Sequence, residues 1–356
     1  MLATSLRIEA LRFQPIKMFK IESTPAKICL GFSALMFFLY SVSFMFFGDC
    51  YVTGGEVCFA PLTNGITDIA DPAYGAGGPE TAFNGVLFFG IFISTMLILF
   101  EGAKGKWIIM LPCSLGLIAM TFGVWNWWND ESMAGPLPKY MSILVTLIYI
   151  GGYLSLRDEG VNDGLSDFKP GLKVKDKIAM SSLIVLVLAG LFYSIRMILT
   201  PNDVIAEGFP ANYGGSLVLA EGLGTPLPTQ VSVTGSLVLV YTLWSALVLM
   251  DGASGKWAVL HPSAFAFITA TVSTYIAFVA DTARNASDAN QMDALTGGAV
   301  MLLVLISYFR LKDEGMEDGM TFMGEPLEDR GQFANGLLLF AFVMGALFTI
   351  NHVLLS

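Results

Sequence analysis

The sequence predicts an all-α integral membrane protein with about nine transmembrane helices: two tandem four-helix repeats and a C-terminal helix. Composition, the length of the apolar segments and an internal repeat lead to this prediction. Hydrophobic residues make up 54% of the 356-residue chain and charged residues only 13%. A soluble protein of this length could not bury so much apolar surface, so the bilayer is the expected solvent.

Nine apolar segments are each long enough to cross about 30 Å of hydrocarbon as a helix. They lie at residues 27–47, 83–100, 107–125, 140–156, 179–199, 233–250, 257–280, 293–310 and 334–354. The predicted parts of the chain are a basic cytoplasmic or interfacial arm (1–26), repeat 1 (27–165), a cytoplasmic linker (166–178), repeat 2 (179–320), and a linker with the ninth helix (321–356).

Two short motifs, each beside an apolar segment, occur twice. The hairpin motif, Glu-Gly-Ala-Lys-Gly-Lys-Trp at 101–107, returns as Asp-Gly-Ala-Ser-Gly-Lys-Trp at 251–257. The exit motif, Leu-Arg-Asp-Glu-Gly-Val-Asn-Asp-Gly at 156–164, returns as Leu-Lys-Asp-Glu-Gly-Met-Glu-Asp-Gly at 311–319. Such self-similarity indicates a duplicated unit. Four helices per unit give both copies the same orientation, related by an axis near the membrane normal.

The basic residues predict the orientation. All but three of the 19 Lys and Arg residues fall on one side of nine alternating helices; the exceptions are Lys139, Arg196 and Arg284. The positive-inside rule then places the N-terminus in the cytoplasm and the C-terminus outside. We expect a prokaryotic cytoplasmic (inner) membrane.

The acidic residues of the exit motif oppose the dipole at a helix C-terminus, so a compensating cation is expected. The lysine that ends each hairpin motif is the natural partner. The predicted structural clamp on the cytoplasmic side consists of Lys106, Asp158, Glu159, Lys256, Asp313 and Glu314. The oxygen-rich exit motifs also allow a divalent-cation site, although their spacing does not match an EF-hand loop. A docking face for a soluble partner is a third interpretation.

Two features of the outer side belong to repeat 1 alone. Trp125, Trp127 and Trp128 end the third apolar segment, where repeat 2 has no tryptophan. They favour an aromatic belt or a contact with a neighbouring subunit, or else a platform for a lipid, pigment or sugar. Cys50 and Cys58 lie in a long outer loop, and on an oxidising side they predict a disulfide.

No catalytic, cofactor-binding or metal-ligating residues are predicted. The sequence lacks a P-loop, a Gly-x-Ser-x-Gly motif and a His-Glu-x-x-His motif, and it holds only two histidines. A net charge of −10 argues against nucleic acid. The favoured function is a structural or accessory subunit of a larger membrane complex, with membrane lipids and other membrane subunits as partners. The alternative is a transporter or channel for a small uncharged solute, because tandem repeats and proline-bearing helices occur in transporters.

Overall fold

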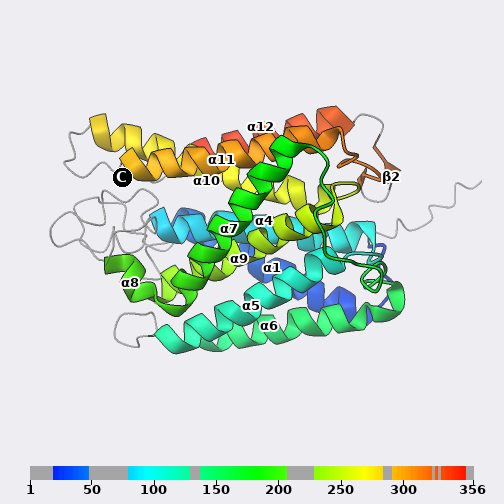
Figure 1. Cartoon of the computed structure of the whole chain (residues 1–356). Coiled ribbons are helices and arrows are strands. Elements are labelled where there is room, and N and C mark those ends of the chain that lie inside the picture. Colours follow the sequence, from blue (N-terminus) through cyan, green and yellow to red (C-terminus); the bar gives the residue numbers. More distant parts are fainter. Residues whose placement is uncertain are drawn as a thin grey trace, which may run out of the picture.

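The computed structural model describes residues 19–47, 79–128, 137–206, 228–283, 291–322, 325–327 and 330–349. In these ranges the regular secondary structure is helical, apart from a short antiparallel pair of strands, β1 (Thr321–Phe322) and β2 (Glu325–Pro326). The longer helices are α1 (Thr24–Phe47), α4 (Pro79–Glu101), α5 (Trp107–Trp127), α6 (Leu137–Ser155), α7 (Lys177–Leu199), α9 (Pro228–Asp251), α10 (Trp257–Ala283), α11 (Gln291–Lys312) and α12 (Arg330–Thr349). Each predicted apolar segment coincides with one of them (Figure 1).

Six helices are long and apolar enough to cross a membrane within the described ranges. The stretches are Thr24–Val42, Phe83–Glu101, Trp107–Trp127, Lys177–Leu199, Pro228–Asp251 and Leu295–Lys312. In α10 and α12 the described apolar stretches, Trp257–Val272 and Gln332–Leu347, are shorter. The all-helical, multi-pass character is therefore supported, whereas nine crossings stay a prediction.

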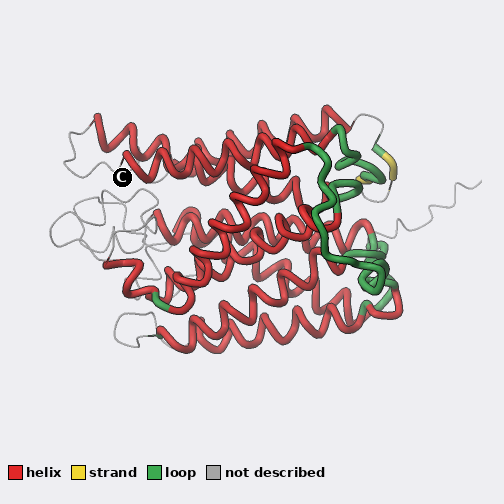
Figure 2. The backbone as a smooth tube through the Cα atoms, in the orientation of Figure 1, coloured by secondary structure: helices red, strands yellow, loops and turns green. Residues whose placement is uncertain are grey.

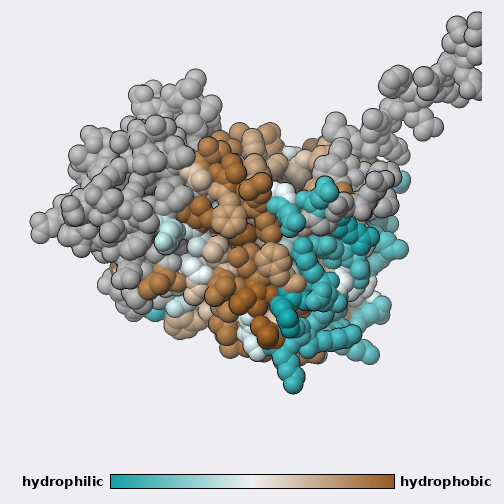
Figure 3. Space-filling model, turned by 90° about the horizontal axis from the view of Figure 1, so that it is seen from above, coloured by the Kyte–Doolittle hydropathy of each residue, from teal (hydrophilic) through white to brown (hydrophobic). Residues whose placement is uncertain are grey.

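The surface matches a bilayer environment. Figure 3 shows apolar side chains as a band across the middle of the visible face and polar side chains at one end. Large apolar residues are exposed on the peripheral helices: Leu188 on α7 is 64% exposed and Leu339 on α12 is 66% exposed. Such side chains are stable in contact with lipid.

The helices pack as two groups around α4 and α9. In the first group α1 contacts α4 and α6, and in the second α7 contacts α9 and α11. The groups are joined where α5 packs on α9 and where α10 packs on α4, while α12 packs on α10 (Figure 1). Small residues allow the close approach of α5 and α9, because a Cβ atom at Gly116 would lie 2.2 Å from a methyl carbon of Val240.

Most of the described turns gather at one end of the bundle, whereas the turn at Thr200, which follows α7, lies at the other. In Figure 2 the loops that follow α4, α6, α9 and α11 lie together on the right, at the end where Figure 3 shows polar side chains. Also there are the 3₁₀ turn η1 (Arg157–Glu159) and β1, where the Thr321 hydroxyl bonds the Glu101 carboxylate. A short helix, α8 (Pro201–Ala206), lies near the opposite end.

Candidate functional site

The hairpin and exit motifs lie against each other. The backbone N–H of Gly105 donates to the Gly160 carbonyl at 2.9 Å, and Gly255 donates to Gly315 at the same distance. All four glycines have positive φ, between 68° and 77°. Residues other than glycine rarely adopt this backbone conformation, which explains the glycine at each position.

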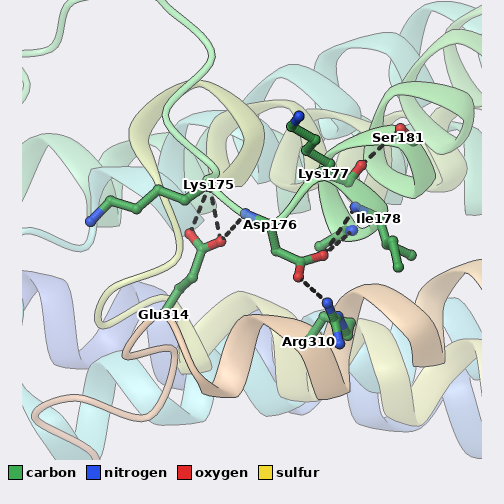
Figure 4. A network of polar contacts seen from close by, with 8 residues as sticks. Lys175, Asp176, Lys177, Ile178, Ser181, Arg310 and Glu314 are labelled. Carbon is green, nitrogen blue, oxygen red and sulfur yellow. Dashed lines mark hydrogen bonds and ion pairs between the residues drawn. The ribbon is translucent and has the colours of Figure 1, made fainter.

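The exit-motif glutamates cap the start of another helix. The Glu159 carboxylate accepts hydrogen bonds from the backbone N–H groups of Glu22 (2.9 Å) and Ser23 (2.6 Å), just before α1. The Glu314 carboxylate accepts from the backbone N–H groups of Lys175 and Asp176, just before α7 (Figure 4). Helix N-termini carry unpaired N–H groups and favour negative charge, so each glutamate stabilises the first turn that it meets.

Asp176 completes this contact in the second group (Figure 4). Its side chain accepts hydrogen bonds from the backbone N–H groups of Ile178 and Ala179 and pairs with Arg310 of α11. The Arg310 guanidinium and the backbone N–H of Ala179 lower the pKa of Asp176. Asp176 therefore links the N-terminus of α7 to the last turn of α11.

The lysines have partners other than those expected from the sequence. Lys256 was expected to pair with Asp313 and Glu314, but its ammonium group lies 2.9 Å from the carboxylate of Asp251 in its own hairpin motif. Lys106 was expected to pair with Asp158 and Glu159. Its ammonium group interacts electrostatically with the Glu101 carboxylate of its own hairpin motif instead. The lysines do not pair with the glutamates because the carboxylates of Glu159 and Glu314 already accept hydrogen bonds from backbone N–H groups.

Burial shapes the electrostatics at Lys106. It lowers the pKa of the Lys106 ammonium group, and the Glu101 carboxylate partly opposes this shift. Asp158 and Asp313, the other two residues of the predicted clamp, have exposed side chains. The structure thus brings Glu159 and Glu314 into helix-capping contacts and leaves the neighbouring aspartates at the surface.

A third shared segment was missed at the sequence level. The N–H of Lys20 donates to the Leu99 carbonyl at 2.9 Å, and the N–H of Lys173 donates to the Leu249 carbonyl at 3.1 Å. These lysines are 153 positions apart (20 and 173), and each is followed by a buried aliphatic residue. In the sequence the two segments share only a short pattern: a lysine, then an aliphatic residue, and two positions after that a residue that can cap a helix. The residues are Lys20, Ile21 and Ser23 in the first segment and Lys173, Val174 and Asp176 in the second. The predicted arm and linker therefore each include a segment bonded to the bundle.

The described residues offer no support for the divalent-cation interpretation. Among them, no three His, Cys, Asp or Glu side chains form a group that could hold a metal ion. The carboxylate of Asp318 in the second exit motif accepts a hydrogen bond from the Ser254 hydroxyl at 3.0 Å. This contact joins the exit motif to the hairpin motif.

The outer tryptophans contact different helices. The indole N–H of Trp125 donates to the Lys139 carbonyl at the start of α6 (3.1 Å), and its ring packs edge-on against Tyr140. The indole N–H of Trp127 donates to the Ile198 carbonyl at the end of α7 (2.9 Å). Trp128 has a buried indole nitrogen without a partner among the described residues. Trp127 thus ties the two helix groups together, whereas Trp125 is 40% exposed.

The predicted disulfide lies outside the described residues, as do both Cys50 and Cys58. Cys29 and Cys113, which the structure does describe, are free thiols. The Cys50–Cys58 disulfide stays a prediction.

A cavity of about 110 Å³ lies within the second helix group and was not predicted from the sequence. Helices α7, α9, α10 and α11 line it, mostly with apolar side chains. Its polar lining residues are Tyr193, Tyr241, Thr242, Ser245, Ser263, Thr296 and Ser307. Ser307 is 2% exposed, and its hydroxyl has no hydrogen-bond partner in the described part of the chain. No short motif marks this cavity, because its residues come from four separate helices.

Comparison with known proteins gives no relative: no protein-family model, curated protein or solved structure matches this chain.

Proposed function

We propose that the chain is a structural or accessory subunit of a larger membrane complex, without catalytic activity of its own. The capping by Glu159 and Glu314 carries this proposal most directly. Glu159 and Glu314, which occupy equivalent positions in the two halves, both bind backbone groups of their own chain. Their role is then to hold the helices, which suits a scaffold.

We also propose how the helices are arranged in units and how these units are oriented in the membrane. Two units of four helices, α1 with α4–α6 and α7 with α9–α11, are related by an axis near the membrane normal. The matching hydrogen bonds at Gly105 and Gly255 and the alternating contacts α5–α9 and α10–α4 support it. We place the turns and N-terminus in the cytoplasm and the C-terminus outside a prokaryotic inner membrane, since the basic residues gather at the turn end.

The outer end of α5 is the proposed contact with other membrane subunits. Trp125 and Tyr140 are 40% and 59% exposed and form one aromatic surface, with Lys139 stacked 4.6 Å from the Trp125 ring. Tryptophan and tyrosine are enriched at energetically important interface positions. Tyr275, at the corresponding position of α10, is also 59% exposed and provides a matched control.

Purification from native membranes in mild detergent, followed by native mass spectrometry, tests this function. We expect the chain to carry partner subunits at fixed stoichiometry. Trp125→Ala combined with Tyr140→Ala should release them, whereas Tyr275→Ala should not. A monomer that conducts a neutral solute across liposomes would contradict the proposal.

That contradicting result would favour a second function, a transporter or channel for a small uncharged solute. The cavity among α7, α9, α10 and α11 is the observation in its favour, because hydroxyl groups line it at mid-helix positions such as Thr242. The same liposome flux measurement decides between the two functions.

A further inference from the structure

The two helix groups differ in the space between their helices. The offsets of the shared turns define corresponding positions: 153 for α1 and α7, 150 for α4 and α9, and 155 for α6 and α11. In the first group the corresponding region is filled by aromatic rings. Phe37 packs against Phe88 (ring centroids 6.1 Å apart) and against Tyr149 (5.9 Å), and both Phe37 and Tyr149 are fully buried.

Small residues replace these rings in the second group. Gly190 stands at the position of Phe37, Val238 at that of Phe88, and Val304 at that of Tyr149. All three replacements line the cavity. The cavity therefore lies where the two halves of the chain have diverged. Val238 and Val304 are smaller than the rings at the corresponding positions, whereas Gly190 allows Thr242 of α9 to pack closely against α7. Close-packed protein interiors rarely tolerate such space without an occupant.

The cavity offers an unpaired hydroxyl group. Ser307 lines it, and Gly152 stands at the corresponding position of the first group. A buried hydroxyl without a hydrogen bond is destabilising, and a ligand oxygen that pairs with Ser307 would remove this penalty. The hydroxyls of Thr242 and Ser263 donate to carbonyl groups of their own helices (2.8 and 2.7 Å) and can still accept.

The position of the cavity determines how a ligand would enter. Leu186, Tyr193 and Val300 line it and are partly exposed near the middle of α7 and α11. The nearby side chains of Leu188 and Leu302 are 64% and 57% exposed. The opening therefore faces the apolar band and not the polar end of the bundle. No lining residue is charged, which favours a neutral ligand.

We propose that this cavity binds the polar end of a neutral membrane amphiphile: a hydroxyl or carbonyl oxygen pairs with Ser307, the adjoining carbons fill the cavity of about 110 Å³, and the rest of the apolar chain extends through the opening into the lipid. The apolar lining accepts the adjoining carbons, and the hydroxyl groups fix the polar end. The inference goes beyond the proposed function, because a scaffold subunit needs no such ligand.

Photolabelling of the full-length protein in nanodiscs tests the site. The probe is hexadecanol with a diazirine group, and the readout is mass spectrometry of labelled peptides. We expect the label on α7 and α11 beside the cavity. Val304→Tyr restores the residue found in the first group and should remove most of this label. Leu302→Tyr, on the lipid-facing side of the same helix, should keep it.

Competition with unlabelled compounds tests the role of Ser307 without filling the cavity. In the wild-type protein, hexadecanol should displace the probe about threefold to tenfold more effectively than hexadecane, the ratio that one neutral hydrogen bond provides. Ser307→Ala should remove this preference. Equal displacement by both compounds in the wild-type protein, or equal labelling of Val304→Tyr and Leu302→Tyr, would overturn the proposal.

Discussion

Single carboxylates determine how the helix ends are held together. Glu314 binds two backbone N–H groups that precede α7, and the adjacent Asp313 is exposed. Hydrogen bonds to a charged acceptor contribute more to stability than those between neutral groups. Two neighbouring acids of the same motif should therefore contribute differently to the stability of the folded protein.

Replacing Glu314 should destabilise the protein more than replacing its neighbour. Glu314→Gln keeps an oxygen acceptor but loses the charge, and should lower stability by about 1–2 kcal/mol. Asp313→Asn is the matched control and should change stability by less than about 0.5 kcal/mol. Thermal unfolding in detergent measures both, and equal midpoints for the two variants would exclude the capping role.

Asp176 should make stability depend on pH. Its folded-state pKa is lowered, chiefly by the hydrogen bond from Arg310. The ionised carboxylate thus contributes stability that is complete above the ordinary aspartate pKa of about 4 and is lost as the pH falls through the lower folded-state value. Asp176→Asn should flatten the loss of thermal stability below about pH 4. Parallel pH curves for the variant and the wild-type protein would refute this linkage.

At the scale of elements, the apolar segments predicted every long helix that the structure describes. Hydrophobic length is a local property of the chain, so a sequence reveals it directly. Contacts between the turns depend on residues far apart: Glu159 bonds the N–H group of Glu22, 137 positions away. From the sequence alone, Lys106 and Lys256 are the expected partners of the acids, because carboxylates at a helix C-terminus call for a cation and no local pattern reveals the unpaired N–H groups.

The turns depend on glycines with positive φ. Gly255 has φ of 69° and donates to the Gly315 carbonyl. Gly255→Ala should lower stability by about 1–2 kcal/mol, the cost of a left-handed conformation with a Cβ atom. Gly298 in α11 is the control, because a Cβ atom there meets open space, and Gly298→Ala should be neutral or stabilising. Thermal unfolding compares the two, and a neutral Gly255→Ala would show that the turn does not need glycine.

At the scale of the whole molecule, the same chain contains one group of helices packed with aromatic rings and one with a cavity. The sequence differences between the repeats that can be recognised without a structure lie on the outer side, at Trp125–Trp128 and at Cys50 and Cys58. The cavity instead lies at mid-helix positions, where Val304 replaces Tyr149. Both residues are ordinary in an apolar helix, so only knowledge of which helices meet makes the difference visible.

Cysteine accessibility in oriented membrane vesicles tests whether the protein is a duplicated membrane scaffold with both sets of turns on the cytoplasmic side. Single cysteines replace Lys104 and Ser254 in the two hairpin motifs and Asn202 in α8, in a chain whose four native cysteines are substituted. We expect a membrane-impermeant maleimide to label Lys104→Cys and Ser254→Cys only from the cytoplasmic side, and Asn202→Cys only from the outside. Labelling of the two hairpin motifs from opposite sides would contradict this arrangement.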